Sequence, residues 1–95
     1  YNNLKEVILL IYFNQIKLLG KWHSVLNKNM IIISIIENNS EVLIPISISN
    51  TIMNQVNTYC SIGAFLDVKG KILVNNKNNI IIKAEKIIIV PINNI

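Results

Sequence analysis

Apolar and polar residues alternate along much of the chain after residue 13, which is typical of strands with one buried face. In residues 14–22 one face carries Ile16, Leu18, Gly20 and Trp22, and in residues 64–73 one face carries Leu66, Val68, Gly70 and Ile72. Residues 30–36 are almost continuously apolar, and the long last strand at 80–90 contains the apolar runs 80–82 and 87–89, as in strands covered on both faces. Residues 42–49 alternate again, and Pro45 places that strand at an edge or a bulge because proline cannot donate to a ladder.

A helical pattern interrupts the strands once. Asn50 and Thr51 are suitable helix caps, and they precede a stripe at three- and four-residue spacing made of Ile52, Met53, Val56, Tyr59 and Cys60. Residues 75–79 are asparagine-rich and predict a hairpin tip. The order is therefore β-β-β-α-β-β, which predicts an all-β, five-stranded OB-fold barrel over residues 14–92, followed by a tail at 93–95.

Residues 1–13 contain a short apolar run, from Val7 to Phe13. This run is far shorter than the ~20 residues of a membrane-spanning helix. A small-residue cleavage site is missing as well, so we expect neither a signal peptide nor a membrane partner. We expect an N-terminal extension here, formed by an extra strand or a short helix that packs on the barrel or on a neighbouring subunit.

The amino-acid composition bears on the cellular compartment and on the net charge of the protein. The 95 residues are 52% hydrophobic, which is enough for one small domain with one core. The single cysteine, Cys60, excludes an intramolecular disulfide and fits the cytoplasm. All nine basic residues are lysines, and the excess of Ile, Asn and Lys indicates an AT-rich genome. The net charge of +4 permits a polyanionic partner without requiring one.

Two segments carry a family resemblance that extends over residues 14–90. The opening segment Asn14–Gly20 resembles the first strand of bacterial single-stranded DNA-binding proteins, and the spacing of Tyr59, Gly63 and Gly70 is similar to the signature of their fourth strand. Pro45 and the closing segment Lys83–Val90 are similar to the PriB branch, the primosomal replication proteins. The resemblance implies non-sequence-specific binding of single-stranded DNA, a role in replication restart with helicase and other primosome partners, and a homodimer or a tetramer.

Candidate contacts to nucleic acid are lysines and aromatic residues, because cations follow phosphates and rings stack on bases. The candidates are Lys69, Lys71, Lys77 and Lys83 on the fourth and fifth strands, Lys21 and Lys28 around the first connection, and the rings of Phe65 and Trp22. A core position is the alternative for Trp22, which shares the parity of Ile16 and Leu18. An inter-subunit contact is the alternative for Phe65.

Other chemistry has little support in the sequence. The only histidine, His23, lacks partners at metal-ligand spacing, and no serine lies beside a base, so we expect no metal, no cofactor and no enzymatic activity. Residues 30–36 and 41–49 contain no aromatic residue, which leaves two alternatives open. One is a minimal general single-strand binding protein. The other is an OB-fold that has drifted into an oligomeric adaptor with little nucleic-acid binding.

Overall fold

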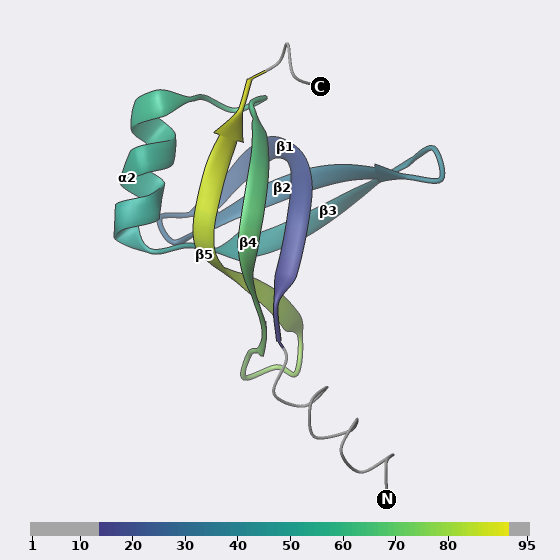
Figure 1. Ribbon diagram of the computed structural model, residues 1–95. Helices are drawn as coiled ribbons and strands as arrows, with labels where there is room; N and C mark the ends of the chain where they lie inside the picture. The colour runs from purple at the N-terminus through teal and green to yellow at the C-terminus, as the bar shows by residue number, and fades with distance from the viewer. Residues whose placement is uncertain (1–13, 92–95) are drawn as a thin grey trace, which may run out of the picture.

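The computed structural model describes residues 14–91, which form a closed five-stranded barrel with one helix between the third and fourth strands (Figure 1). The elements are β1 (Ile16–Asn27), β2 (Met30–Glu37), β3 (Ser40–Ser47), α2 (Asn50–Tyr59), β4 (Phe65–Val74) and β5 (Ile80–Val90). Around the barrel the strands follow the order β1-β2-β3-β5-β4. The expected OB-fold is therefore confirmed, while the N-terminal extension and the tail at 93–95 lie outside the described residues.

The barrel interior is filled by alternate side chains of the strands. Completely buried members of this core are Ile31, Ile33, Ile46, Leu66 and Val68. Trp22 lies among them with 2% of its surface exposed, and its Nε1 donates a hydrogen bond to the carbonyl of Ser24. Burial of these side chains supplies the main stabilisation of a domain of this size.

Strand β1 is longer than the alternation predicts, because two register shifts interrupt the alternation in its second half. Its first half pairs with β4 and its second half pairs with β2, and Lys21 takes part in both ladders. Register shifts follow Trp22 and Val25, so the alternation is lost although the strand continues to Asn27. Gly20 lies just before the point where the pairing of β1 passes from β4 to β2. It packs so closely against Ile33 and Ser34 that a Cβ atom at residue 20 would collide with them.

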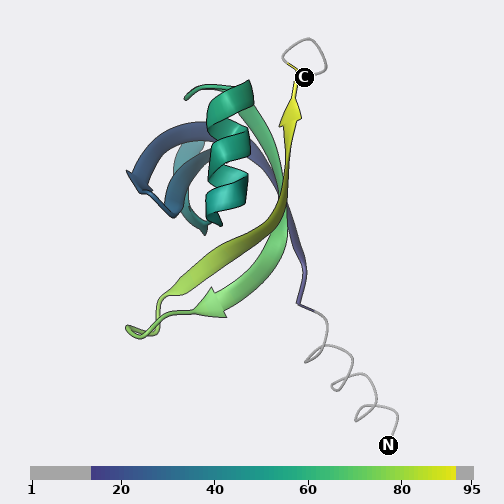
Figure 2. The same cartoon turned by 90° about the vertical axis from the view of Figure 1, so that its left-hand side faces the viewer.

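Helix α2 lies along one side of the barrel, next to β5 (Figures 1 and 2). Met53 and Val56 are its buried residues, as the stripe predicts. The N-cap is Ser49, whose hydroxyl accepts a hydrogen bond from the amide of Ile52, so the expected cap at Asn50 and Thr51 was one residue late. Tyr59 is 74% exposed, so its expected core position was also wrong; the helix ends there and turns the ring outward.

The β2–β3 hairpin extends beyond the barrel as a two-stranded ribbon (Figure 1). Asn38 and Asn39, the two residues of its turn, both have positive φ values (51° and 64°), which is the geometry of a tight hairpin turn. Pro45 pairs with Ile32 of β2, and the contact of β3 with β5 begins only at Ile46, so the proline lies at an edge as expected. Within residues 14–91, no helix is long and apolar enough to cross a membrane.

Candidate nucleic-acid interface

Strand β4 lies in the middle of a three-stranded part of the barrel wall, between β1 and β5. Its side chains alternate in the expected way: those of Leu66 and Val68 point into the core. The intervening residues Phe65, Asp67, Lys69 and Lys71 form the middle of the outer face. The outward side chains of β4 and of its two neighbouring strands therefore form one surface that faces the solvent.

Lysines from the three strands lie in register on this outer face. Lys69 is directly opposite Lys17 of β1 on one side and Lys86 of β5 on the other. The next outward residue of β4, Lys71, is opposite Lys83. Like charges in directly opposed positions of a sheet are destabilising. The two rows therefore carry an electrostatic cost that a bound anion would remove.

We call this surface the lysine face, and it comprises Lys17, Lys21, Lys69, Lys71, Lys83 and Lys86. All six side chains are exposed. The acidic residues on the same face are Asp67 and Glu85, so its net charge is 6 − 2 = +4. The Nζ atom of Lys71 is 3.6 Å from the carboxylate of Glu85, and both side chains are largely open to solvent. An ion pair of this kind is weak, so it leaves Lys71 available for another anion.

Phe65 contributes an aromatic ring at one end of the lysine face. It lies between Lys21 of β1 and Val90 of β5 in the cross-strand register. The residue is half-buried. The structure thus places Phe65 on the same surface as the lysines, where part of the ring is available for stacking.

Lys77 lies at the tip of the β4–β5 hairpin, in a loop that Asn75 organises. The side-chain oxygen of Asn75 accepts hydrogen bonds from the amides of Lys77 (2.9 Å) and Asn79 (3.0 Å). Asn78 has a φ of 60°, a left-handed conformation that asparagine tolerates well. The hairpin that follows directly from the lysine face therefore carries a further cation on an ordered tip.

Two of the candidate residues lie neither on the lysine face nor on the β4–β5 hairpin. The ring of Trp22 is in the core and has no face free for stacking, so its candidate role as a stacking residue was wrong. Lys28 lies in the β1–β2 turn, at the opposite end of β1 from Lys17. Its neighbour Asn29 is hydrogen-bonded to Asn50, which ties that turn to the start of α2 rather than to the lysine face.

Two lysines of this surface, Lys17 and Lys86, were absent from the sequence candidates. Lys17 shares the outward parity of Lys21, but only the register between β1 and β4 reveals that it is opposite Lys69. The ladder of β4 and β5 shifts between Lys69 and Gly70, so Glu85 is an extra residue, and simple alternation misassigns Lys86. The outward alternation along β1 could have identified Lys17, whereas nothing in the sequence marks the bulge.

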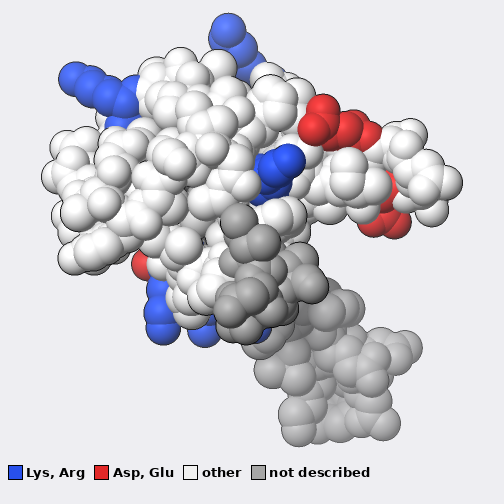
Figure 3. All heavy atoms as spheres, turned by 90° about the horizontal axis from the view of Figure 1, so that it is seen from above, with Lys and Arg blue, Asp and Glu red and all other residues white. Residues whose placement is uncertain are grey.

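The β2–β3 ribbon has the opposite character. We call residues 35–43 the β2–β3 arm; they contain Glu37 and Glu41 and neither a lysine nor an aromatic residue. Ser34 donates a hydrogen bond of 2.7 Å to Glu41 at the base of the arm. In Figure 3 the arm carries red side chains and no blue ones on the side shown. The arm is thus net negative, whereas the lysine face is net positive.

Groups for metal or thiol chemistry are sparse in the part of the chain that the structure describes. It contains no cluster of three or more His, Cys, Asp or Glu side chains able to hold a metal ion. His23 contacts the hydroxyl of Ser24 on the exposed surface of β1. Burial raises the pKa of the Cys60 thiol, whose Sγ donates to the carbonyl of Val56. This environment stabilises the neutral thiol.

Comparison with known proteins gives a clear result for the fold alone. No protein-family model and no curated protein sequence matches the chain. The mitochondrial single-stranded DNA-binding protein Rim1 of Saccharomyces cerevisiae superposes with a TM-score of 0.71 at 15% identity, covering 82% of this chain and 93% of Rim1.

Two further solved structures are similar. The N-terminal domain of PriB from Thermoanaerobacter tencongensis, described as dimeric, has a TM-score of 0.68 at 22% identity, covering 82% of this chain and 97% of that one. The SSB domain of a Synechococcus protein has a TM-score of 0.63 at 7% identity, covering 80% and 94%. The chain therefore has the OB-fold that these proteins share, with a helix between the third and fourth strands.

Proposed function

We propose that this protein binds single-stranded DNA through the lysine face and the β4–β5 hairpin. The observation that carries the proposal is the pair of lysine rows, Lys17–Lys69–Lys86 and Lys71–Lys83. Opposed lysines repel one another, and a chain of phosphates is the ligand that would turn this repulsion into attraction. Similarity of the fold to proteins described as single-stranded DNA-binding supports the same ligand.

Binding through this surface is expected to depend on the nucleic-acid backbone. Successive outward residues of β4, such as Lys69 and Lys71, are about 7 Å apart, so they contact successive phosphates of an extended strand. Among residues 14–91, Phe65 is the one aromatic residue beside the lysine face, so the described part of this surface offers bases a single ring to stack on. Contacts of this kind read charge rather than sequence, which favours binding without a sequence motif.

Within this class we propose a PriB-type role in replication restart, with a helicase and other primosome proteins as partners. The likeness of the fold to a PriB domain supports this role, as do Pro45 and the residues of Lys83–Val90. A minimal general single-strand binding protein remains the alternative. A pull-down with a restart helicase separates the two, because only the PriB-type role requires that contact.

We also propose that the protein forms a homodimer through β1. Ile16–Gly20 pair with β4 on one side only, and no other strand within residues 14–91 pairs with their second edge. An open strand edge is a template for pairing with another chain. Leu19, which is 54% exposed on this segment, would be covered by a second copy. Sedimentation over a range of concentrations tests the dimer.

The experiment that tests DNA binding is a titration of fluorescent oligo-dT, followed by anisotropy at increasing salt concentrations. The logarithm of the affinity should fall linearly with the logarithm of the salt concentration. Lys69→Ala, Lys71→Ala and Lys77→Ala should each weaken binding and reduce the steepness of this line by about 0.7. Lys28→Ala is the matched control, because it removes the same charge from outside the lysine face. No binding at low salt would refute the proposal.

A second candidate function, an oligomeric adaptor, is favoured by the β2–β3 arm. Its Ile36 is 67% exposed and Leu43 is 48% exposed, and the flanking charges are acidic. Exposed apolar residues beside charges are typical of protein interaction sites. This function becomes the working account if oligo-dT fails to bind while the protein still self-associates.

A further inference from the structure

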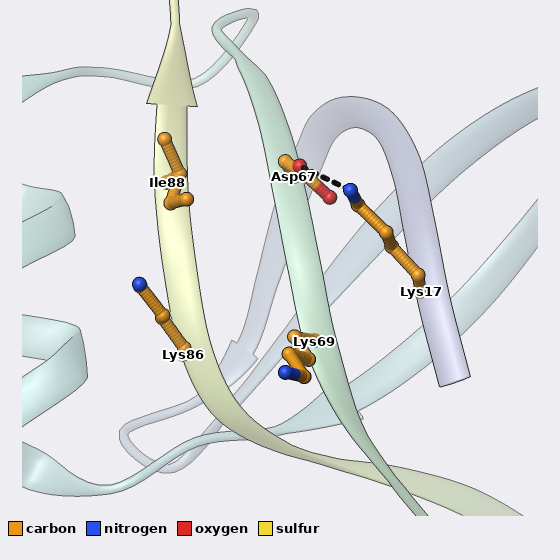
Figure 4. A pocket seen from close by; sticks show the side chains of 5 residues that line it. All are labelled: Lys17, Asp67, Lys69, Lys86 and Ile88. Atoms are coloured by element: carbon orange, nitrogen blue, oxygen red, sulfur yellow. Dashed lines mark ion pairs between the residues drawn. The ribbon is translucent and has the colours of Figure 1, made fainter. Parts of the chain in front are cut away.

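A shallow pocket of about 260 Å³ lies on the lysine face between β1, β4 and β5 (Figure 4). It is lined by Lys17, Asp67, Lys69, Lys86 and Ile88. Three cations, one carboxylate and one apolar side chain therefore surround a single concave site. These groups are complementary to the three parts of one nucleotide: a phosphate, a base edge with N–H donors, and the flat apolar surface of the base.

Asp67 is the unexpected member of this set, because it has few partners of its own. Its Oδ2 is 3.8 Å from Nζ of Lys17, which is longer than a hydrogen bond. Its Oδ1 is covered and has no hydrogen-bond partner among the residues that the structure describes. The side chain is only 23% exposed, so water cannot fully replace the missing donors. A half-buried acceptor in this state is unfavourable unless a ligand supplies a donor.

The backbone of single-stranded DNA cannot supply that donor. Its phosphates are acceptors and carry negative charge, so a carboxylate in the middle of the lysine face repels them. A surface built for the backbone alone would be better without Asp67. The N–H groups of the bases are the donors that a DNA strand can offer to this carboxylate.

We infer that this pocket seats one nucleotide, with its phosphate on Lys17, Lys69 and Lys86 and its base edge donating to Asp67, and that it favours guanine. Guanine presents two adjacent donors, N1–H and the N2 amino group, which match a carboxylate once rotation of the Asp67 side chain brings its covered Oδ1 into the pocket. Thymine presents a single N–H, and cytosine and adenine present an amino group beside an acceptor. Ile88, which is 48% exposed, is the apolar surface against which the base packs. The inference rests on the proposed binding of single-stranded DNA and adds a base preference to it.

The test compares oligomers of equal length made of thymidine, deoxycytidine or 7-deaza-deoxyguanosine, titrated by anisotropy at one salt concentration. The 7-deaza base keeps both donors of guanine and prevents quadruplex formation. Wild-type protein should bind the deazaguanine oligomer about tenfold more tightly than oligo-dT. Asp67→Asn should reduce this ratio to about twofold or less, because the amide replaces one acceptor oxygen with a donor.

Glu85→Gln is the matched control, because it also removes one negative charge from the lysine face. Both variants should tighten binding to oligo-dT, but Glu85→Gln should leave the tenfold ratio unchanged. Equal wild-type affinity for the three oligomers would overturn the inference and leave the proposed function intact, and so would a ratio that survives Asp67→Asn. Failure of all three oligomers to bind would overturn the proposed function together with the inference.

Discussion

Gly70 of β4 lies against the backbone of Lys83 of β5, so closely that a Cβ atom at residue 70 would collide with the carbonyl group of Lys83. The contact occurs at the register shift between Lys69 and Gly70, where Glu85 is the extra residue of β5. Because of this shift, Lys83 and Lys86 both lie on the outward face although they are three residues apart, opposite Lys71 and Lys69. The glycine therefore shapes the lysine face without contributing a side chain to it.

Gly70→Ala should lower the free energy of unfolding by about 1–3 kcal/mol, as is usual when a side chain is forced into a filled space. Chemical denaturation with urea measures the change. Asn76→Ala, at the exposed tip of the same hairpin, should change the stability by less than about 0.5 kcal/mol. Equal stability of Gly70→Ala and wild type would show that the two backbones separate more easily than the structure indicates.

Lys69→Gln should stabilise the fold while it weakens DNA binding. Lys69 is directly opposite two other lysines, so its removal relieves like-charge repulsion worth about 0.2–1 kcal/mol for each pair. The gain should be largest at low salt and should fade as salt screens the charges. Thermal unfolding at several salt concentrations measures it. Lys28→Gln should show no such gain, and a destabilised Lys69→Gln would contradict this account of the lysine rows.

Ser49→Ala should cost about 1 kcal/mol of stability, because the Ser49 hydroxyl accepts the hydrogen bond from the amide of Ile52 at the start of α2. Thr51→Ala is the control, since Thr51 is an exposed residue inside the helix and not its cap. Urea denaturation of both variants decides between the two positions. A larger loss in Thr51→Ala would favour the cap that the sequence alone suggested.

Trp22 makes the protein's own fluorescence a probe of the core. Because its ring is 2% exposed, its emission should be blue-shifted and resistant to quenching by acrylamide. Addition of oligo-dT should leave the emission nearly unchanged, since stacking on a base requires an exposed ring. Strong quenching by oligo-dT at saturating concentrations would show that Trp22 contacts the DNA and would contradict its core position.

Cys60 should react slowly with iodoacetamide in the native protein. Burial raises the pKa of its thiol, and the thiolate is the reactive form. The rate should therefore keep rising at pH values where the unfolded chain has already reached its plateau. A pH profile of alkylation for native and urea-unfolded protein tests this. Coincident profiles would mean that the thiol is fully solvated.

Alternation predicted the barrel well, because the inward residues in the first part of β1 and of β4 follow a period of two. The alternation failed where a bulge adds a residue to one strand and so reverses which residues point inward. The bulges after Trp22 concealed the second half of β1, and the bulge at Glu85 concealed the outward position of Lys86. At the end of α2 the stripe was wrong for Tyr59, although Cys60 after it packs against the core, because helical spacing does not reveal that the chain turns the Tyr59 ring to solvent.

Part of the candidate interface followed from the sequence for the same reason. Lys69, Lys71 and Phe65 lie on one strand, so their common face is a local property of β4. Lys17 and Lys86 join them only through pairing between strands that are distant in the chain. Such a register depends on turns and bulges, which a residue pattern does not specify. The position of Trp22 did not depend on strand pairing. It lies on the same face of its strand as Ile16 and Leu18, and this pattern alone indicated the core.

The separation of charge between the lysine face and the β2–β3 arm gives the molecule an electric dipole. A polyanion attracts the positive pole and repels Glu37 and Glu41, so the protein turns during its approach and arrives with the lysine face forward. Molecules bound to one strand in the same orientation would then hold their arms in a common direction, and Glu37 and Glu41 would be repelled by the phosphates. Each bound molecule would thus hold its exposed Ile36 and Leu43 toward the surrounding solution, where a second protein can reach them.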